Sequence, residues 1–170
     1  QPFYVNSPYG IALAHNGNLI NSDKLKSDLF KEDLRHINTK SDSEILLNIF
    51  AHELYLHSKE AFTPDSIFYA VAGVHRRVKG AYAVVSLITD RGIVAFRDPY
   101  GIRPLCYGTR KNNGKTETMI ASESVALDSS GFKLERDLNP GEAIFVDLNG
   151  DVHTRQCSEN NNHTPCIFEY

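Results

Sequence analysis

The chain has 170 residues, of which 18 are basic and 21 acidic, so its formal net charge is −3 at pH 7. This length suits a single domain with one sizeable core. The basic residues form no stripe, which excludes the electrostatic footprint of a nucleic-acid-binding protein. No apolar run approaches the roughly 20 residues that a membrane span requires, so a membrane is not an expected partner either.

The cysteines indicate the compartment. Cys106, Cys157 and Cys166 are odd in number and lie outside CxxC spacing, which argues against a disulfide framework and favours a reducing cytoplasm. No signal peptide is recognisable. The chain opens on Gln1 rather than Met, and we therefore expect it to be a fragment of a longer protein.

The stretch HNGNL (residues 15–19) follows an apolar run and suggests a strand that ends in a turn. Residues 9–15 read as the strand, and Asn16-Gly17 is among the commonest turn dipeptides. The same pair offers two hydrogen-bond donors, the side-chain amide of Asn16 and the backbone N–H of Gly17. Converging donors suit a developing oxyanion, and glycine lets a substrate approach closely. Taken alone, the stretch favours an ordinary turn over an oxyanion hole.

A helix is expected to begin near Ser41. Ser41 and Glu44 have the spacing of a capping box, and the apolar run that follows keeps helical spacing through Leu54. Asp42 would lie in the first turn, where the helix macrodipole favours a carboxylate. A carboxylate there could also hold a substrate ammonium, although the local pattern favours the helix-starting role.

Two further helices are predicted. One runs from about Lys24 to Lys31 with Ser22 or Asp23 as its cap, and the other runs from Pro64 to an end at Gly80. The basic cluster at 75–77 is interpreted as a solvated helix end, since cations are expected there. The residues expected to be buried on these helices are Leu25, Leu29, Ile67, Phe68, Val71, Val74 and Val78.

The second half of the chain is predicted to be rich in strands. A hairpin joins residues 81–88 to 93–96, and the stiff, charged loop Arg97–Leu105 follows it. That loop could bind an anionic ligand, but an internally paired loop that braces the sheet is favoured, because its charges can satisfy buried groups. The remaining predicted elements are strands at 105–108, 118–121, 142–146 and 152–156 and a short helix at 122–127. This order suits α+β layering.

Several longer stretches carry a resemblance that covers nearly the whole chain. They are QPFYVNSPYGIALAHNGNL, RHINTKSDSEILLNIFA, GAYAVVSLI, GIVAFRDPYGIRPL, ASESVALDSSGF, NPGEAIFVDLNG and PCIFEY. Together they resemble, in the same order, the glutaminase domain of the amidophosphoribosyltransferase family. The resemblance implies an α+β fold of the N-terminal-nucleophile hydrolase type, a four-layer αββα sandwich that is incomplete at the N-terminus.

The resemblance also implies an activity. In this family an N-terminal cysteine attacks the side-chain amide of L-glutamine, with its own α-amino group as the base. The ammonia passes to a covalently linked phosphoribosyltransferase domain, which forms 5-phosphoribosylamine from phosphoribosyl pyrophosphate in the first committed step of purine synthesis. The family's nucleophile would lie upstream of Gln1, and none of the three cysteines stands at a chain start. This chain by itself is therefore expected to be inactive.

Site residues follow from the matching motifs. Asn16 and Gly17 in HNGN correspond to the oxyanion-hole pair, and Asp42 in SDSE to the carboxylate that grips the α-amino group of glutamine. His15 and Asn18 are interpreted as supports for the HNG segment. The Arg97–Leu105 stretch is typical of the family but receives no catalytic step.

The resemblance divides the chain into a glutaminase domain at 1–157, with its N-terminal part missing, and a linker at 158–170 toward the transferase domain. No metal is expected in the glutaminase site, and Mg²⁺ is expected with phosphoribosyl pyrophosphate in the other domain. Cys166 occupies a position that helps to ligate an iron–sulfur cluster in some members, but a free structural thiol is favoured. The intact protein is expected to be a homo-oligomer in the cytoplasm.

Two alternatives stay open. One is another class II glutamine amidotransferase, of the glucosamine-6-phosphate synthase, asparagine synthetase or glutamate synthase type, which would share the HNG segment and an SDSE-like acid. The other is a non-catalytic module of this fold. The latter is disfavoured, because oxyanion and substrate-grip residues have little use without a nucleophile.

Overall fold

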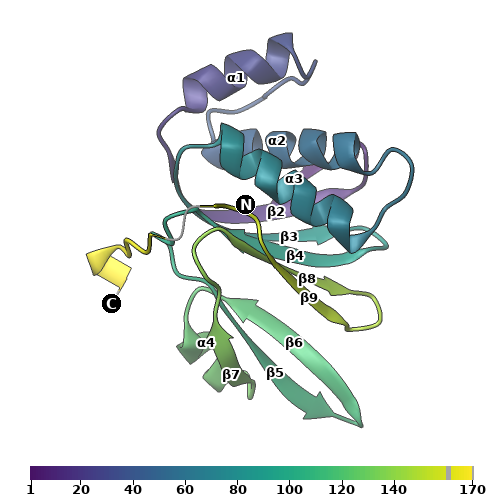
Figure 1. Ribbon diagram of the computed structural model, residues 1–170, viewed down its shortest axis with the longest axis vertical. Helices are drawn as coiled ribbons and strands as arrows, with labels where there is room; N and C mark the ends of the chain where they lie inside the picture. Colours follow the sequence, from purple (N-terminus) through teal and green to yellow (C-terminus); the bar gives the residue numbers. More distant parts are fainter. Residues whose placement is uncertain (160–161, 170) are drawn as a thin grey trace.

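The computed structural model describes residues 1–159 and 162–169 and contains two antiparallel sheets (Figure 1). The six-stranded sheet has the order β1 (Phe3–Val5), β2 (Ile11–Leu19), β3 (Gly80–Ile88), β4 (Gly92–Arg97), β8 (Glu142–Asp147) and β9 (Val152–Gln156). The three-stranded sheet has the order β6 (Lys115–Ala121), β5 (Cys106–Asn112) and β7 (Lys133–Asp137). The helices are α1 (Ser22–Lys31), α2 (Asp42–His57), α3 (Pro64–Arg77) and α4 (Ser124–Ser129), and a 3₁₀ turn covers Ile167–Glu169.

The elements stack as helices, sheet, sheet and helix. Figure 1 shows α2 and α3 over one face of the six-stranded sheet, α1 beyond them, and the three-stranded sheet with α4 on the opposite side. The main core lies between the helices and the large sheet, and a smaller core lies between the two sheets. The smaller core consists of Ala83, Ala95, Leu105, Leu138 and Ile144. The predicted α+β layering with antiparallel sheets is confirmed.

Alternation along the strands explains which face each core takes. In β2, Ile11, Leu13 and His15 point toward the helices and are buried, whereas Ala14 and Asn16 on the other face are exposed. This is the period-2 pattern of a strand with one covered face. All seven helix residues predicted to be buried are buried.

The helix starts differ in detail from prediction. The predicted capping box of α2 is wrong: Ser41 makes no side-chain cap bond, and the Glu44 carboxylate instead accepts hydrogen bonds from Asn38 and Thr39. The cap of α1 is Asn21, not Ser22 or Asp23, and its side chain bonds the segment that joins α3 to β3. The Glu44 side chain is thus taken by the segment just before its own helix, whereas that of Asn21 is taken by a segment 56–58 residues away.

The basic end of α3 is not a solvated end as predicted. The helix ends at Arg77, before Gly80, and the Arg77 guanidinium bonds Asp33 at 2.7 Å and Glu53 at 3.2 Å. The ring of His75 lies in the core, where Nδ1 is 2.8 Å from the Tyr82 hydroxyl. Burial lowers the pKa of His75 to about 4. Only Arg76 is exposed as the sequence suggested.

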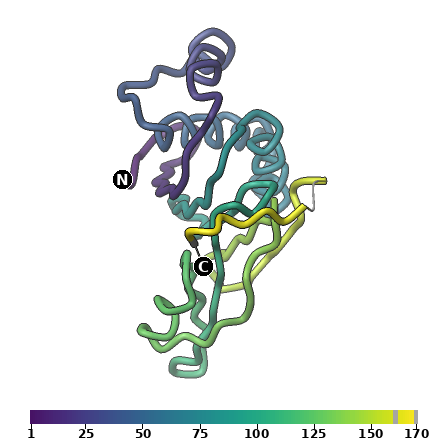
Figure 2. Tube along the Cα trace, turned by 90° about the vertical axis from the view of Figure 1, so that its left-hand side faces the viewer, coloured from purple at the N-terminus to yellow at the C-terminus, as the bar shows by residue number. Residues whose placement is uncertain are grey.

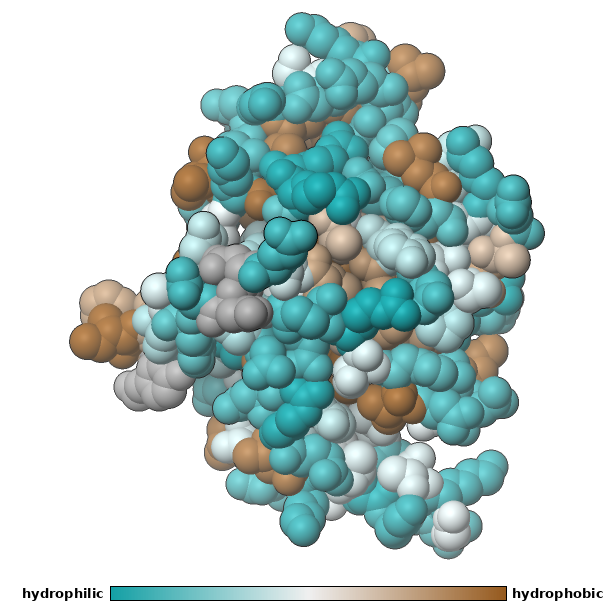
Figure 3. Space-filling model, in the orientation of Figure 1, coloured by the Kyte–Doolittle hydropathy of each residue, from teal (hydrophilic) through white to brown (hydrophobic). Residues whose placement is uncertain are grey.

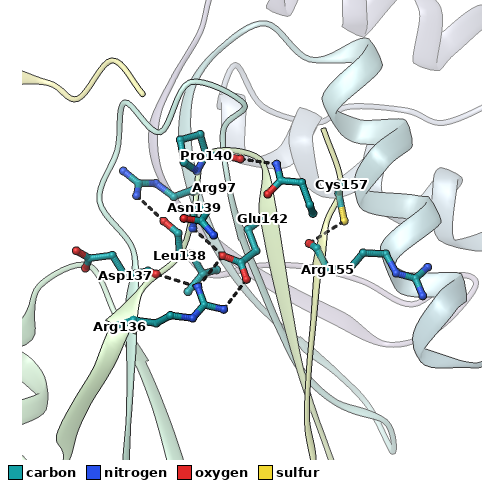
Figure 4. Close-up of polar contacts among 10 residues, drawn as sticks. Arg97, Arg136, Asp137, Leu138, Asn139, Pro140, Glu142, Arg155 and Cys157 are labelled. Atoms are coloured by element: carbon teal, nitrogen blue, oxygen red, sulfur yellow. Dashed lines mark hydrogen bonds and ion pairs between the residues drawn. The ribbon is translucent and has the colours of Figure 1, made fainter. Parts of the chain in front are cut away.

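Polar contacts join the two sheets at the β7–β8 connection (Figure 4). The Arg136 guanidinium donates to both oxygens of Glu142 at 2.6 and 2.8 Å, and the backbone N–H of Asn139 donates to the same carboxylate at 2.7 Å. Arg97 on β4 donates to the carbonyl of Leu138 at 2.8 Å. A bidentate pair of this kind fixes direction as well as distance, so the small sheet is held at a defined angle.

The chain after β9 returns across the molecule, as the yellow tube in Figure 2 shows. The backbone N–H groups of Thr164 and Cys166 donate to the carbonyls of Tyr100 and Ile102 at 2.9 and 3.1 Å. Ile167 and Phe168 beyond this contact are largely exposed. Elsewhere on the face drawn in Figure 3, hydrophobic residues are scattered among hydrophilic ones.

No helix in the described part of the chain is long and apolar enough to cross a membrane.

Candidate active site

The HNGNL stretch is not a turn. It continues strand β2, which pairs with β3 as far as Leu19, so that Asn16 faces Ala83 and Gly17 faces Tyr82. The predicted end of the strand at Asn-Gly is therefore wrong. An Asn-Gly turn forms when the two flanking segments pair with each other, whereas here the partner strand comes from much later in the sequence.

The ladder orients the backbone groups of this stretch. The carbonyl of Gly10 accepts a hydrogen bond from the N–H of Thr89, and the N–H of Ile20 donates to the carbonyl of Lys79. The backbone groups of the even-numbered residues of β2 therefore face β3. The N–H groups of His15 and Leu19 face the other way. In an antiparallel ladder the two directions alternate, and the N–H of Gly17 therefore points away from β3 as well.

Among the described residues, no strand pairs with that outer edge of β2 where the candidate residues lie, and we call this part of β2 the open edge. Strand β1 pairs with β2 only up to Leu13. Beyond it, the N–H of His15 donates to Oε1 of Gln1 at 2.5 Å, and the N–H of Leu19 donates to Oδ2 of Asp42 at 2.8 Å. Gly17 lies midway between these two capped positions. Side chains bind the N–H groups on either side of Gly17, whereas neither a strand nor a side chain of the described residues binds the N–H of Gly17 itself.

Only glycine fits at position 17. Its φ is +146°, and a Cβ there would lie 1.9 Å from the carbonyl oxygen of Ala81. A contact that short with backbone cannot be relieved by rotating a side chain. The backbone at this point can therefore approach β3 closely while its N–H faces outward.

Asn16 and Asn18 both lie on the exposed face of β2. Asn16 immediately precedes the outward N–H of Gly17, so the two predicted donors adjoin the same open edge. Asn18 flanks them on the side of Leu19. The structure thus brings together Asn16, Gly17 and Asp42, and places Asn18 beside them.

The first turn of α2 meets this edge at two points. Besides the contact of Asp42 with Leu19, the hydroxyl of Ser43 lies 3.1 Å from Nδ1 of His15. Burial lowers the pKa of His15; the negative charge of Asp42 opposes this shift, and the positive charge of Arg103 adds to it. His15 is accordingly neutral at pH 7. Ser43 was not singled out from the sequence, because only the tertiary contact over 28 residues reveals its partner.

The Arg97–Leu105 loop is internally paired, as predicted. The carboxylate of Asp98 is fully buried and accepts hydrogen bonds from the backbone N–H groups of Tyr82, Tyr100, Ile102 and Arg103. The Arg97 guanidinium donates to the carbonyls of Gly101, Arg103 and Leu138. The two buried charges are thus satisfied by backbone groups, which is how a buried charge avoids a desolvation cost of several kcal/mol.

The cysteines lie outside this edge. Burial raises the pKa of Cys106 to about 11 and that of Cys157 to about 12, so both are thiols at neutral pH. Cys166 is half-buried and free. Within residues 1–159 and 162–169, no three His, Cys, Asp or Glu side chains are grouped to hold a metal ion.

Comparison with known proteins identifies the family of the chain. The model of the glutamine amidotransferase domain matches residues 1–129. Over its whole length the chain is 57% identical to the amidophosphoribosyltransferases of Pseudomonas aeruginosa and Escherichia coli. The matched region is 34% of each of those proteins. The identity to the Saccharomyces cerevisiae amidophosphoribosyltransferase is 49%, again over the whole chain and 34% of that protein. The chain therefore spans about a third of the length of these relatives.

Solved structures agree with this likeness. The chain is similar to the glutamine phosphoribosylpyrophosphate amidotransferase of B. subtilis in complex with ADP and GMP, with a TM-score of 0.76 and 31% identity over 99% of this chain and 34% of that one. For a structure described as the allosteric regulatory enzyme of purine biosynthesis, the TM-score is 0.78 and the sequence identity is 30%. That match covers 99% of this chain and 33% of that one. These neighbours confirm the predicted N-terminal-nucleophile hydrolase fold. With most of its length matched by the domain model and its fold shared with these enzymes, the chain belongs to the family of glutamine amidotransferase domains.

Proposed function

We propose that this chain is the glutamine-hydrolysing domain of an amidophosphoribosyltransferase, which uses the released ammonia to make 5-phosphoribosylamine from phosphoribosyl pyrophosphate. The observation that carries the proposal is the placement of the outward N–H of Gly17 on β2, between Asn16 and Leu19, whose own N–H donates to Asp42. The relatives at 49–57% identity are amidophosphoribosyltransferases, which supports this enzyme over other class II amidotransferases.

The spacing along this edge suits glutamine. Successive outward N–H groups of a strand are roughly 7 Å apart, because each residue advances the strand by about 3.3 Å. The N–H of Gly17 and the carboxylate that caps Leu19 are separated by one such step. In glutamine, four bonds join the α-nitrogen to the amide carbon. An extended glutamine can therefore place its amide at Gly17 and its ammonium at Asp42.

In the proposed reaction, Asn16 and Gly17 donate to the oxygen that becomes negative when the amide carbon is attacked. Such donors act because charge develops there only in the transition state. Asp42 keeps Oδ2 on the N–H of Leu19 and offers Oδ1 to the substrate ammonium. His15 and Asn18 support this edge. The nucleophile is the N-terminal cysteine of the intact enzyme, whose amino group accepts the thiol proton and returns it to the nitrogen as the C–N bond breaks and ammonia leaves. Water then hydrolyses the thioester to give glutamate and the free thiol.

The proposed partners follow from the same enzyme. They are L-glutamine and a covalently linked phosphoribosyltransferase domain, where Mg²⁺ would accompany phosphoribosyl pyrophosphate. Residues 1–157 would form the glutaminase domain and 158–170 the connection. We propose a homo-oligomer in the cytoplasm and a free thiol, rather than an iron–sulfur ligand, at Cys166.

The test uses the full-length enzyme and two substitutions. Asn16→Ala removes one oxyanion donor and is expected to lower kcat for glutamine about 100-fold, because one such donor contributes on the order of 3 kcal/mol. Asp42→Asn keeps an oxygen for the N–H of Leu19 but removes the charge. It is expected to raise KM for glutamine more than about tenfold, since a hydrogen bond to a charged group contributes about 1.5–3 kcal/mol.

Ammonia-dependent formation of phosphoribosylamine serves as the control in the same preparations. It should be unchanged in both variants, because ammonia bypasses the glutamine site. If both variants hydrolyse glutamine as the wild type does, the site assignment is wrong. If the wild type hydrolyses glutamine but transfers ammonia to a different acceptor, the chain belongs to another class II amidotransferase.

A further inference from the structure

The first turn of α2 is fastened to β2 on both sides of Gly17. On one side, Oδ2 of Asp42 accepts from the N–H of Leu19 at 2.8 Å. On the other side, the hydroxyl of Ser43 lies 3.1 Å from Nδ1 of His15. Gly17 lies two residues from each fastened position, so any shift of β2 against α2 moves its N–H.

The contact between Ser43 and His15 is enclosed. The exposed fraction is 2% for Ser43 and 9% for His15. Water therefore cannot easily replace the hydroxyl. Its loss leaves Nδ1 without a partner in addition to Nε2, which is buried and has no hydrogen-bond partner among the described residues. A buried polar group without a partner lowers the stability of the fold, unless it moves to a place where it finds another partner. The bond thus constrains where the His15 side chain, and the backbone that carries it, can lie.

We infer that Ser43 is a positioning residue for glutamine hydrolysis, which holds His15 and thereby sets the place of the Asn16 and Gly17 donors relative to Asp42. This inference rests on the proposed function. Ser43 does not itself reach the open edge of β2, because its hydroxyl is directed to the ring of His15 on the covered face. Its effect is therefore transmitted through His15.

The expected kinetic signature follows from the two separate fastenings. Without the Ser43 hydroxyl, Asp42 keeps its own bond to Leu19, so the grip on the substrate ammonium persists. The oxyanion donors lose their second support, and a misplacement near 1 Å can cost a reaction about 100-fold. An interaction made only in the transition state lowers kcat without raising KM. The loss should therefore appear in kcat.

The chain offers a matched control. Ser86 is also buried, at 1% exposure, and its hydroxyl also bonds β2, donating to the carbonyl of Ala12 at 3.1 Å. Ser86 lies on β3 opposite Leu13 of β2, away from Leu19 and outside the candidate site. Ser86→Ala therefore removes an equivalent buried hydrogen bond to the same strand without touching the residues around Gly17.

The experiment measures glutamine hydrolysis by the full-length enzyme with Ser43→Ala and with Ser86→Ala. Ser43→Ala should lower kcat by about tenfold or more, with KM changed less than about threefold, while Ser86→Ala leaves both parameters near the wild-type values. Thermal unfolding and ammonia-dependent synthesis check that both variants are folded. Equal kinetics in the two variants, or a loss confined to KM, would overturn the inference.

A double-substitution cycle tests the route through His15. If Ser43 acts through His15, adding Ser43→Ala to His15→Ala causes no further loss of kcat, because the bond is already absent. Losses that multiply would contradict that route. If His15→Ala does not fold, His15→Phe replaces it in the cycle, since it keeps the volume of the ring but has no nitrogen for the Ser43 hydroxyl. Failure of the proposed function looks different, because Asn16→Ala would then leave glutamine hydrolysis unchanged.

Discussion

Gly17 combines a structural requirement with the chemical role that we propose for it, an oxyanion donor. Its positive φ and its close approach to Ala81 let β2 and β3 stay paired through the site. The same residue presents its N–H to the open edge. Because this donor belongs to the backbone, no side-chain substitution removes it directly, and a change at position 17 acts by displacing it.

Gly17→Ala is therefore expected to impair both stability and glutamine hydrolysis. The added Cβ would meet the Ala81 carbonyl at 1.9 Å, so the strands must separate; we expect a loss above about 3 kcal/mol in the free energy of unfolding. Gly114→Ala is the control, since Gly114 also has positive φ but no atom within 4 Å of the added Cβ. It should cost only about 1–2 kcal/mol. Urea unfolding of both variants checks this, and equal losses would contradict the steric argument.

At this scale, the sequence singles out candidate residues but not the contacts around them. Asn16, Gly17 and Asp42 were predicted to work together, and the structure places them at one edge. The bond of Asp42 to Leu19 and that of Ser43 to His15 join residues 23 and 28 positions apart. No local pattern carries that information, because the contacts depend on how α2 packs on β2.

Among the elements, the helix layer is held by a buried charge network. Arg77 at the end of α3 bonds Asp33, which follows α1, and Glu53 near the C-terminal end of α2. The side chains of Asp33 and Glu53 are only 5% and 8% exposed. One guanidinium thus ties α3 to α2 and to the turn that follows α1.

Arg77→Leu is expected to destabilise the protein by about 3 kcal/mol, because it leaves two buried carboxylates without their shared cation. The neighbouring Arg76 is exposed, and Arg76→Leu should change stability by less than about 0.5 kcal/mol. Thermal unfolding of the two variants gives the comparison. Equal stabilities would mean that the carboxylates find other partners, such as His52 beside Asp33.

Elements with a clear period were predictable, and those without one were not. The β3–β4 hairpin, the start of α3 and strand β9 agree with prediction, since each combines a periodic pattern with a turn or cap signal. Strands β1 and β7 were missed. Strand β1 has three residues between prolines, and β7 has the charged sequence KLERD with little burial. Both exist because neighbouring strands pair with them.

Across the whole molecule, buried histidines link stability to pH. The pKa of His75 in the core is lowered to about 4, and burial also lowers the pKa values of His15 and His52. Each of these rings binds a proton more readily when the chain is unfolded. Protonation therefore favours unfolding, and stability must fall as the pH decreases below about 6.5.

For His75 alone, this loss is at most about 3 kcal/mol between pH 6.5 and pH 4, since each pKa unit corresponds to about 1.4 kcal/mol. Urea unfolding at several pH values should show the decline in the wild type. His75→Asn cannot take up the proton and should show a shallower dependence in the same range. A slope unchanged by the substitution would show that His75 is not the titrating group.

The return of the chain after β9 has a consequence for tethering. Because Thr164 and Cys166 are bonded to Tyr100 and Ile102, the free path of any following segment starts at Cys166, beside the Arg97–Leu105 loop, and not at the end of the sheet. A shorter tether raises the effective concentration of what it carries. In a longer protein, a domain that follows would thus be confined to the volume around this loop.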